Sequence, residues 1–272
     1  LDNDNQNQYG QAIELNYTAT LNDKAASQTG RPGFENTVRV EFSNNPDSDG
    51  TGDTGFTPWD TVVCFTYKID GLKINNHDKT LEGAKFRLYS DKDCKNEVYV
   101  KESQDGYIVI NRDSLGGDDH TGGSVPGDAV EMVSNADGIF KIFGLDQGTY
   151  WLKETDSPDG YRELLDPIEI TITPTFTTDR DNYVAGAGAT DQTLKTLTAT
   201  AHMKEFLNGA FNEGTSNLKT DVETGTVNIT VVNQVGTKLP VTGSSATVIM
   251  LGAGVVLASI AIAKNKRKDS AE

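Results

Sequence analysis

Three polar residues occupy positions where the surrounding pattern predicts apolar side chains. Lys73 continues the odd-numbered phase of its predicted strand, whose apolar members are Val63, Phe65, Tyr67 and Ile69. Glu154 shares its phase with Tyr150 and Leu152, and Asn233 shares its phase with Val227, Ile229 and Val231. Side chains two residues apart on a strand point to the same face, so all three are expected to point into apolar surroundings, whereas Lys68 falls on the opposite face.

Burial of these groups would change the charge of two of them. Desolvation lowers the pKa of a lysine and raises the pKa of a glutamic acid, so Lys73 and Glu154 can both be neutral. A neutral Lys73 amine is a nucleophile, and protonated Glu154 can donate a hydrogen bond that polarises a carboxamide such as that of Asn233. Taken singly, the same residues also fit an ordinary Lys73–Glu154 ion pair and a strand-end turn residue at Asn233.

The elements that must position these residues read as β-strands. Between residues 11 and 236 the apolar residues mostly alternate with period two, which favours half-buried strands over helices. Turn signals such as Asp105-Gly106 and Asp137-Gly138 punctuate the runs, as in an all-β sandwich. Only residues 191–208 could form a helix, and their threonine content makes that a weak prediction. The predicted strands are 13–21, 38–42, 63–69, 86–88, 107–110, 140–143, 150–152, 168–172 and 227–231.

Composition excludes several classes of function. The 272 residues include 40 Asp and Glu against 24 Lys and Arg, a net charge of −16, which argues against general binding to nucleic acid. The two cysteines, Cys64 and Cys94, allow at most one internal disulfide. No serine–histidine–aspartate set, metal-ligand cluster or phosphate-binding glycine loop stands out, so neither a cofactor nor a metal is expected.

The C-terminal residues 237–272 carry three features in a fixed order. Leu239, Pro240, Val241, Thr242 and Gly243 come first, followed by the uncharged run 246–263 and then the basic tail 264–272. As a helix the uncharged run would rise about 27 Å, just enough to cross a bilayer. The basic tail should stay cytoplasmic, which leaves everything before residue 246 outside the cell. A simple tail anchor would produce this order only by coincidence.

This C-terminal arrangement resembles the cell-wall sorting signal of Gram-positive surface proteins. The resemblance implies that a sortase cleaves between Thr242 and Gly243 and joins the Thr242 carbonyl to an amine of peptidoglycan or of a neighbouring pilin subunit. The chain would then be the substrate of an enzyme and not an enzyme itself. It would contact the membrane only before sorting and end at the cell wall.

Two further motifs resemble the Cna-B-like, prealbumin-like domains of Gram-positive pilins, also called SpaA-type. Residues 150–161 (YWLKETDSPDGY) look like the E-box of that family, with Ser157 where the family has alanine, and residues 81–89 (LEGAKFRLY) look like its Leu-x-Gly-Ala-x-Phe-x-Leu strand. The resemblance implies a β-sandwich domain over residues 59–236. It also implies an autocatalytic amide cross-link between Lys73 and Asn233, with Glu154 as the catalytic residue and Lys68 as the alternative nucleophile.

Residues 1–58 are similar to the last part of a preceding Ig-like pilin domain and its linker. The chain begins at Leu1 and not at Met, so we expect a fragment or a processed chain. Asn44 continues the phase of Val38, Val40 and Phe42, and the resemblance makes it a candidate acceptor of a second cross-link. An extracellular setting permits a disulfide between Cys64 and Cys94, but the sequence leaves their pairing open.

The resemblance therefore implies a shaft, or backbone, subunit of a sortase-assembled pilus at the cell surface. The alternative is a non-polymerised, wall-anchored adhesin that uses the same domain as a stalk and binds host matrix or another cell. A pilin-motif lysine separates the two, and in the family it normally lies in an N-terminal domain that would precede Leu1. The sequence itself identifies no host ligand.

Overall fold

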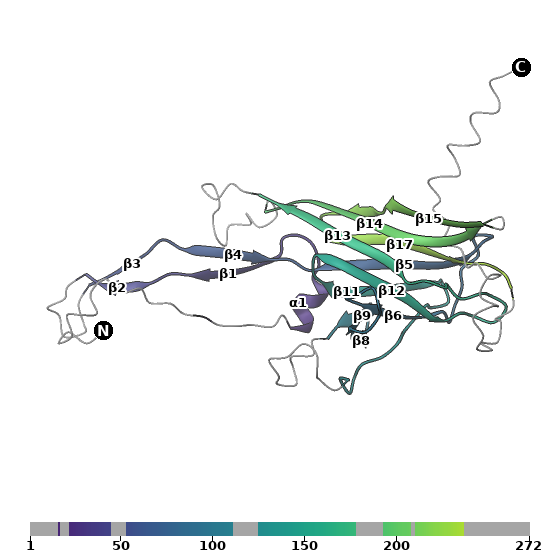
Figure 1. The fold of residues 1–272 in the computed structure, drawn as a ribbon. Coiled ribbons are helices and arrows are strands. Elements are labelled where there is room, and N and C mark those ends of the chain that lie inside the picture. The colour runs from purple at the N-terminus through teal and green to yellow at the C-terminus, as the bar shows by residue number, and fades with distance from the viewer. Residues whose placement is uncertain are drawn as a thin grey trace, which may run out of the picture.

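The computed structural model describes residues 16, 22–44, 53–110, 125–177, 193–207 and 210–236, and for residues 205–207 and 210–212 it describes the backbone alone. Within these ranges the regular elements are β-strands, apart from the five-residue helix α1 (Asp23–Ser27). The prediction of an all-β chain is therefore confirmed. Figure 1 shows that most strands form a sandwich and that the first four extend away from it beside α1.

Two sheets make up the sandwich. The six-stranded sheet runs in the order β16 (Lys219–Asp221), β17 (Thr226–Asn233), β5 (Tyr67–Asn75), β11 (Ile139–Leu145), β9 (Gly106–Val109) and β8 (Val100–Ser103). The seven-stranded sheet runs in the order β10 (Met132–Val133), β6 (Lys85–Tyr89), β12 (Gly148–Asp156), β13 (Ile168–Phe176), β14 (Leu194–Leu207) and β15 (Ala210–Asn217), with β7 (Glu97–Val98) paired to β6.

The core lies between the two sheets and takes alternate residues from each. Ile69 and Ile142 contribute from the six-stranded sheet, and Leu88 and Ile170 from the seven-stranded sheet, all without exposed surface. The ring of Phe86 stacks on that of Phe140 with centroids 4.5 Å apart. Strand β5 alternates between buried and half-buried residues along its whole length, which confirms the predicted period of two.

Strands β5 and β17 lie side by side and run parallel, although they stand near opposite ends of the domain's sequence. Their register pairs Lys73 with Val231 and Asn75 with Asn233. The other edge of β5 pairs with β11 in antiparallel fashion. Because β5 is flanked on both edges, its inward side chains occupy the middle of the six-stranded sheet.

The weak helix prediction for residues 191–208 is wrong, because β14 occupies residues 194–207 as a strand. Leu197, Ala199, Ala201 and Met203 are buried in alternation, and β14 pairs with β13 on one edge and β15 on the other. Threonines fill many of the intervening positions, where a β-branched side chain suits a pleated surface better than a helix. The alternation of apolar residues with threonines in the sequence therefore already indicated a strand.

The chain before β5 forms a ribbon of two short ladders, in which β1 (Phe34–Val38) pairs with β4 (Asp60–Cys64) and β2 (Glu41–Ser43) with β3 (Thr54–Phe56). The predicted strand 38–42 is interrupted at residues 39–40, and Val38, Val40 and Phe42 are 46–60% exposed instead of half-buried. The β1–β4 ladder joins residues on both sides of position 58, where the sequence predicts a domain boundary.

Helix α1 is tied to the sandwich. The Asn22 side chain caps it by accepting from the Ala25 N–H, and Ala26 packs with Ile108 and Phe143 in a small apolar cluster. Among the residues that the structure describes, no helix is long and apolar enough to cross a membrane. The predicted membrane span 246–263, the pentapeptide 239–243 and the basic tail 264–272 all lie outside the described residues.

Candidate functional site

Lys73 lies on the inward face of β5, in the middle of the core. Its side chain has no exposed surface, and its Nζ lies 5.8 Å from the centroid of the Phe86 ring. Lys68, on the same strand, points to the other face, where its Nζ lies 3.4 Å from Asp70 Oδ2. Odd–even parity along β5 therefore separates the two lysines as the sequence predicts.

Asn233 ends β17 on the strand next to Lys73, and it too is fully buried. The parallel register brings the two side chains together, and Lys73 Nζ donates a hydrogen bond to Asn233 Oδ1. The two residues are 160 positions apart in the sequence. Only the pairing of the domain's first and last long strands makes them neighbours.

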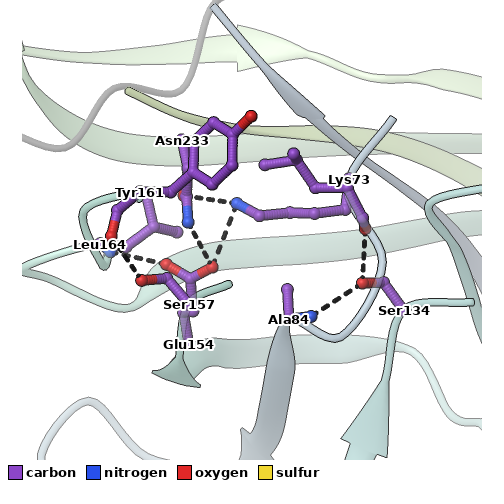
Figure 2. Close-up of polar contacts among 9 residues, drawn as sticks. Lys73, Ala84, Ser134, Glu154, Ser157, Tyr161, Leu164 and Asn233 are labelled. Carbon is purple, nitrogen blue, oxygen red and sulfur yellow. Dashed lines mark hydrogen bonds and ion pairs between the residues drawn. The ribbon is translucent and has the colours of Figure 1, made fainter. Parts of the chain in front are cut away.

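Glu154 reaches the pair from β12, in the opposite sheet (Figure 2). Its Oε1 lies 3.1 Å from Lys73 Nζ and accepts a hydrogen bond of 2.8 Å from Asn233 Nδ2. Its Oε2 accepts a hydrogen bond of 2.7 Å from the backbone N–H of Leu164. One carboxyl oxygen therefore faces both the Lys73 and the Asn233 nitrogen, while the other holds the side chain in place.

Burial sets the protonation of this group. Desolvation lowers the pKa of Lys73 to about 8, against the opposing attraction of Glu154. Desolvation also raises the pKa of Glu154, against the attraction of Lys73 and the hydrogen bonds from Leu164 and Asn233. Both shifts favour the neutral forms, which are a free amine and a carboxylic acid. The arrangement thus holds a nucleophile, an acyl group and a proton carrier in contact.

The backbone around Lys73 is clamped by groups that the sequence analysis did not single out. The Lys73 N–H donates to Gly138 O at 2.7 Å, and the Lys73 carbonyl accepts from Leu81 N–H at 3.0 Å. Buried Ser134 in turn donates through its Oγ to Leu81 O at 2.7 Å and accepts from Ala84 N–H at 3.0 Å. Figure 2 shows Ser134 beside Ala84, below the Lys73 strand.

The E-box motif closes the other side of the site. Ser157 Oγ donates to the carbonyl oxygen of Tyr161 at 2.8 Å, and the Tyr161 hydroxyl accepts from Asn75 Nδ2 at 3.2 Å. Asn75 lies two positions after Lys73 on β5, so the sequence alone could have predicted that its side chain also points inward. The Leu164 N–H had no such signal, because a backbone donor looks the same in any sequence.

The remaining candidate residues lie apart from this group. Asn44 is exposed beside the β2–β3 ladder, where its backbone N–H donates to Asp53 O, and its role as an acceptor stays a prediction. Cys64 and Cys94 are both free thiols, so the structure holds no disulfide between them. Cys64 ends β4, whereas Cys94 lies in the β6–β7 turn with a φ of +53°. Within the described ranges, no three acidic, histidine or cysteine side chains gather as metal ligands would.

The comparison with protein families identifies the fold around this site. Residues 67–183 match the SpaA family model, which describes a prealbumin-like fold domain. This part of the chain has the prealbumin-like fold. The matched range holds Lys73 and Glu154, whereas Asn233 lies beyond it. None of the curated proteins compared with the chain matches its sequence.

Solved structures similar to the chain include three pilins. The pilus 2b backbone protein of group B streptococcus is 20% identical over 71% of this chain and 48% of its own, with a TM-score of 0.33. BcpA, the major pilin subunit of Bacillus cereus, is 18% identical over 76% and 40%, with a TM-score of 0.36. The shaft pilin of Lactobacillus rhamnosus GG is 16% identical over 66% and 50%, with a TM-score of 0.32. The chain thus spans half or less of each pilin's length.

Proposed function

We propose that this chain is a structural subunit of a sortase-assembled pilus, in which an amide bond between Lys73 and Asn233 locks the prealbumin-like domain. The observation that carries the proposal is the fully buried contact of Lys73, Glu154 and Asn233 between β5, β12 and β17. An ordinary buried ion pair would not need the Asn233 carboxamide in contact with both charged groups. The E-box and the match to the family model support the same reading.

The proposed reaction is a single acyl transfer. The neutral Lys73 Nζ attacks Asn233 Cγ, a new Nζ–Cγ bond forms, and the Cγ–Nδ2 bond breaks. Glu154 Oε1 contacts both nitrogens, so it can take the proton that the amine loses and deliver one to the departing Nδ2. The products are a secondary amide and one molecule of ammonia, and Glu154 ends in its starting form. The step happens once per molecule, so the chain is not a turnover enzyme.

The rate of cross-link formation is expected to pass through a maximum as the pH rises. Below the raised pKa of Glu154 the pair carries two protons and Lys73 is a non-nucleophilic ammonium. Above the pKa of Lys73, which is about 8, the pair has lost its last proton and holds none to deliver to the departing nitrogen. The rate should therefore fall on both sides of this window. Chain recovered unfolded from inclusion bodies, diluted into buffers from acid to alkaline pH and quenched for mass spectrometry, measures it. A rate that rises steadily past the pKa of Lys73 would exclude Glu154 as the proton carrier.

Anchoring is the second part of the proposal. The pentapeptide Leu239 to Gly243, the uncharged run 246–263 and the basic tail support cleavage by a sortase and transfer of Thr242 to an amine. That amine belongs to peptidoglycan or to a neighbouring pilin subunit, which places the protein at the cell surface. A covalent bond between β5 and β17 suits this position, because it keeps the domain closed when its two ends are pulled.

Expression in a Gram-positive host that carries the pilus sortase tests the anchoring. A shaft subunit expressed together with the N-terminal domain in which the family carries its pilin-motif lysine is expected to give a ladder of covalent multimers that survives boiling in detergent. Thr242→Ala should leave monomer outside the wall fraction. The cross-link variant Glu154→Gln is the matched control, since it should still be anchored. A single wall-bound species in place of a ladder would favour the adhesin alternative, and anchoring that persists in Thr242→Ala would overturn the sorting proposal.

A further inference from the structure

A cavity of about 810 Å³ lies at the end of the sandwich away from Lys73, beside helix α1. Tyr67 and Lys73 share the inward face of β5, and six residues of strand put about 20 Å between them. The volume falls in the range of small-molecule sites. Its walls are more apolar than polar and come from both sheets and from the strand that leads into β5. Their apolar residues include Val63, Phe65, Val98, Val109, Leu145 and Phe176.

Tyr67 gives this cavity an unmet hydrogen-bonding group. Its side chain lines the cavity and the residue is 1% exposed, yet its hydroxyl has no hydrogen-bond partner among the described residues. Burial, with a smaller contribution from the nearby Asp146 carboxylate, raises the pKa of this hydroxyl, so it stays protonated and can both donate and accept. Buried polar groups are nearly always paired, so an orphan hydroxyl inside a cavity points to a missing partner.

The charged residues around the cavity favour a positively charged ligand. Among the described residues, its charged lining residues are Asp23, Asp128 and Asp146, against one cation, Lys101. Lys101 pairs with Asp23, which leaves the exposed carboxylates of Asp128 and Asp146 without a cation among the lining residues. The Tyr150 hydroxyl is occupied by the Asp146 backbone. The cavity therefore combines an apolar interior with a negative rim.

The rings of Phe65 and Phe176 line the same space with centroids 5.6 Å apart, so a planar ring could pack against them. We propose that this cavity binds a small aromatic amine, with its ring against Phe65 and Phe176 and its ammonium between the Tyr67 hydroxyl and the Asp146 carboxylate. The apolar part of such a ligand matches the apolar walls. Its ammonium matches the unpaired Tyr67 hydroxyl and the negative rim. The site is independent of the cross-link proposed above.

Calorimetric titration of the full chain with 2-phenylethylamine tests the proposal. The uncharged 2-phenylethanol and the anionic 3-phenylpropanoate, which have the same ring, serve as matched probes and should bind at least tenfold more weakly. Tyr67→Phe removes the hydroxyl alone and should weaken binding of the amine about fivefold, and Asp146→Asn about tenfold. Asp137→Asn, an exposed aspartate in the turn before β11, should leave binding unchanged.

The two free cysteines provide a second readout. Cys64 lines the cavity and is exposed, whereas Cys94 lies in the β6–β7 turn outside it. Bound 2-phenylethylamine should slow alkylation of Cys64 and leave the rate at Cys94 unchanged. Equal binding of the three probes, no binding of the amine, or full binding by Tyr67→Phe would each overturn the proposal. Preferential binding of Nα-acetyl-lysine amide would also overturn it, since the occupant would then be a lysine side chain of a partner protein.

Discussion

The intact mass of the purified chain is expected to fall short of its sequence mass by one ammonia molecule, and Glu154→Gln is expected to restore the full mass. The glutamine keeps the size and polarity of the side chain but cannot carry the proton between Lys73 Nζ and Asn233 Nδ2. Without that transfer the buried amine and carboxamide stay in contact and do not react. High-resolution mass spectrometry of the two proteins measures the difference directly.

Lys68→Met is the matched control for this experiment. Lys68 lies on the same strand as Lys73 but faces Asp70 on the other side of β5, so its variant should keep the ammonia loss while Lys73→Met should not. Proteolysis of the parent should release a branched peptide that joins Lys73 to Asn233. A parent with full sequence mass would remove the cross-link from the proposed function, and an effect of Lys68→Met would move the nucleophile to that residue.

The second large effect is expected in stability. The bond would close a loop of 160 residues, and the chain-entropy relation for cross-links assigns such a loop about 5 kcal/mol of unfolding free energy. For a domain of this size that corresponds to a melting temperature about 10–20 °C lower when the bond cannot form. Calorimetric melting of the parent and of the double variant Lys73→Met, Glu154→Gln measures this difference.

The double variant is chosen because it removes both buried ionisable groups together. A single Lys73 or Glu154 substitution would leave the other group buried without its partner, which alone costs about 3–5 kcal/mol. Removing both groups together avoids that cost, so a lower melting temperature can be ascribed to the missing bond. If the double variant melts within a few degrees of the parent, the bond contributes little to thermal stability.

Parity along the strands predicted that the three residues of the site point inward, whereas their selection as a reacting group came from the E-box resemblance. The alternation of β5 is regular from Tyr67 to Asn75, so a charged residue on the apolar phase was visible without any structure. Glu154 and Asn233 were visible for the same reason on β12 and β17. Parity works because side chains on a strand can point to only two faces, and burial favours one of them.

Alternation along a strand did not predict burial where no second layer covers the apolar face. Val38, Val40 and Phe42 follow an apolar pattern, yet they are exposed on the ribbon, because alternation says which residues share a face and not whether anything covers it. For β14 a helix remained open until its pairing with β13 and β15 was known. The free thiols of Cys64 and Cys94 likewise follow from where β4 and the β6–β7 turn lie.

The sequence by itself determined the strand character of the domain, the inward direction of Lys73, Glu154 and Asn233, and the order of motifs at the C-terminus. Tertiary structure alone decided that β17 pairs with β5 in parallel, so that residues 160 positions apart touch. It also decided that the Leu164 N–H orients Glu154 and that Tyr67 lines a cavity. These contacts arise between distant segments, and no local pattern of residues specifies which distant segment will supply a partner.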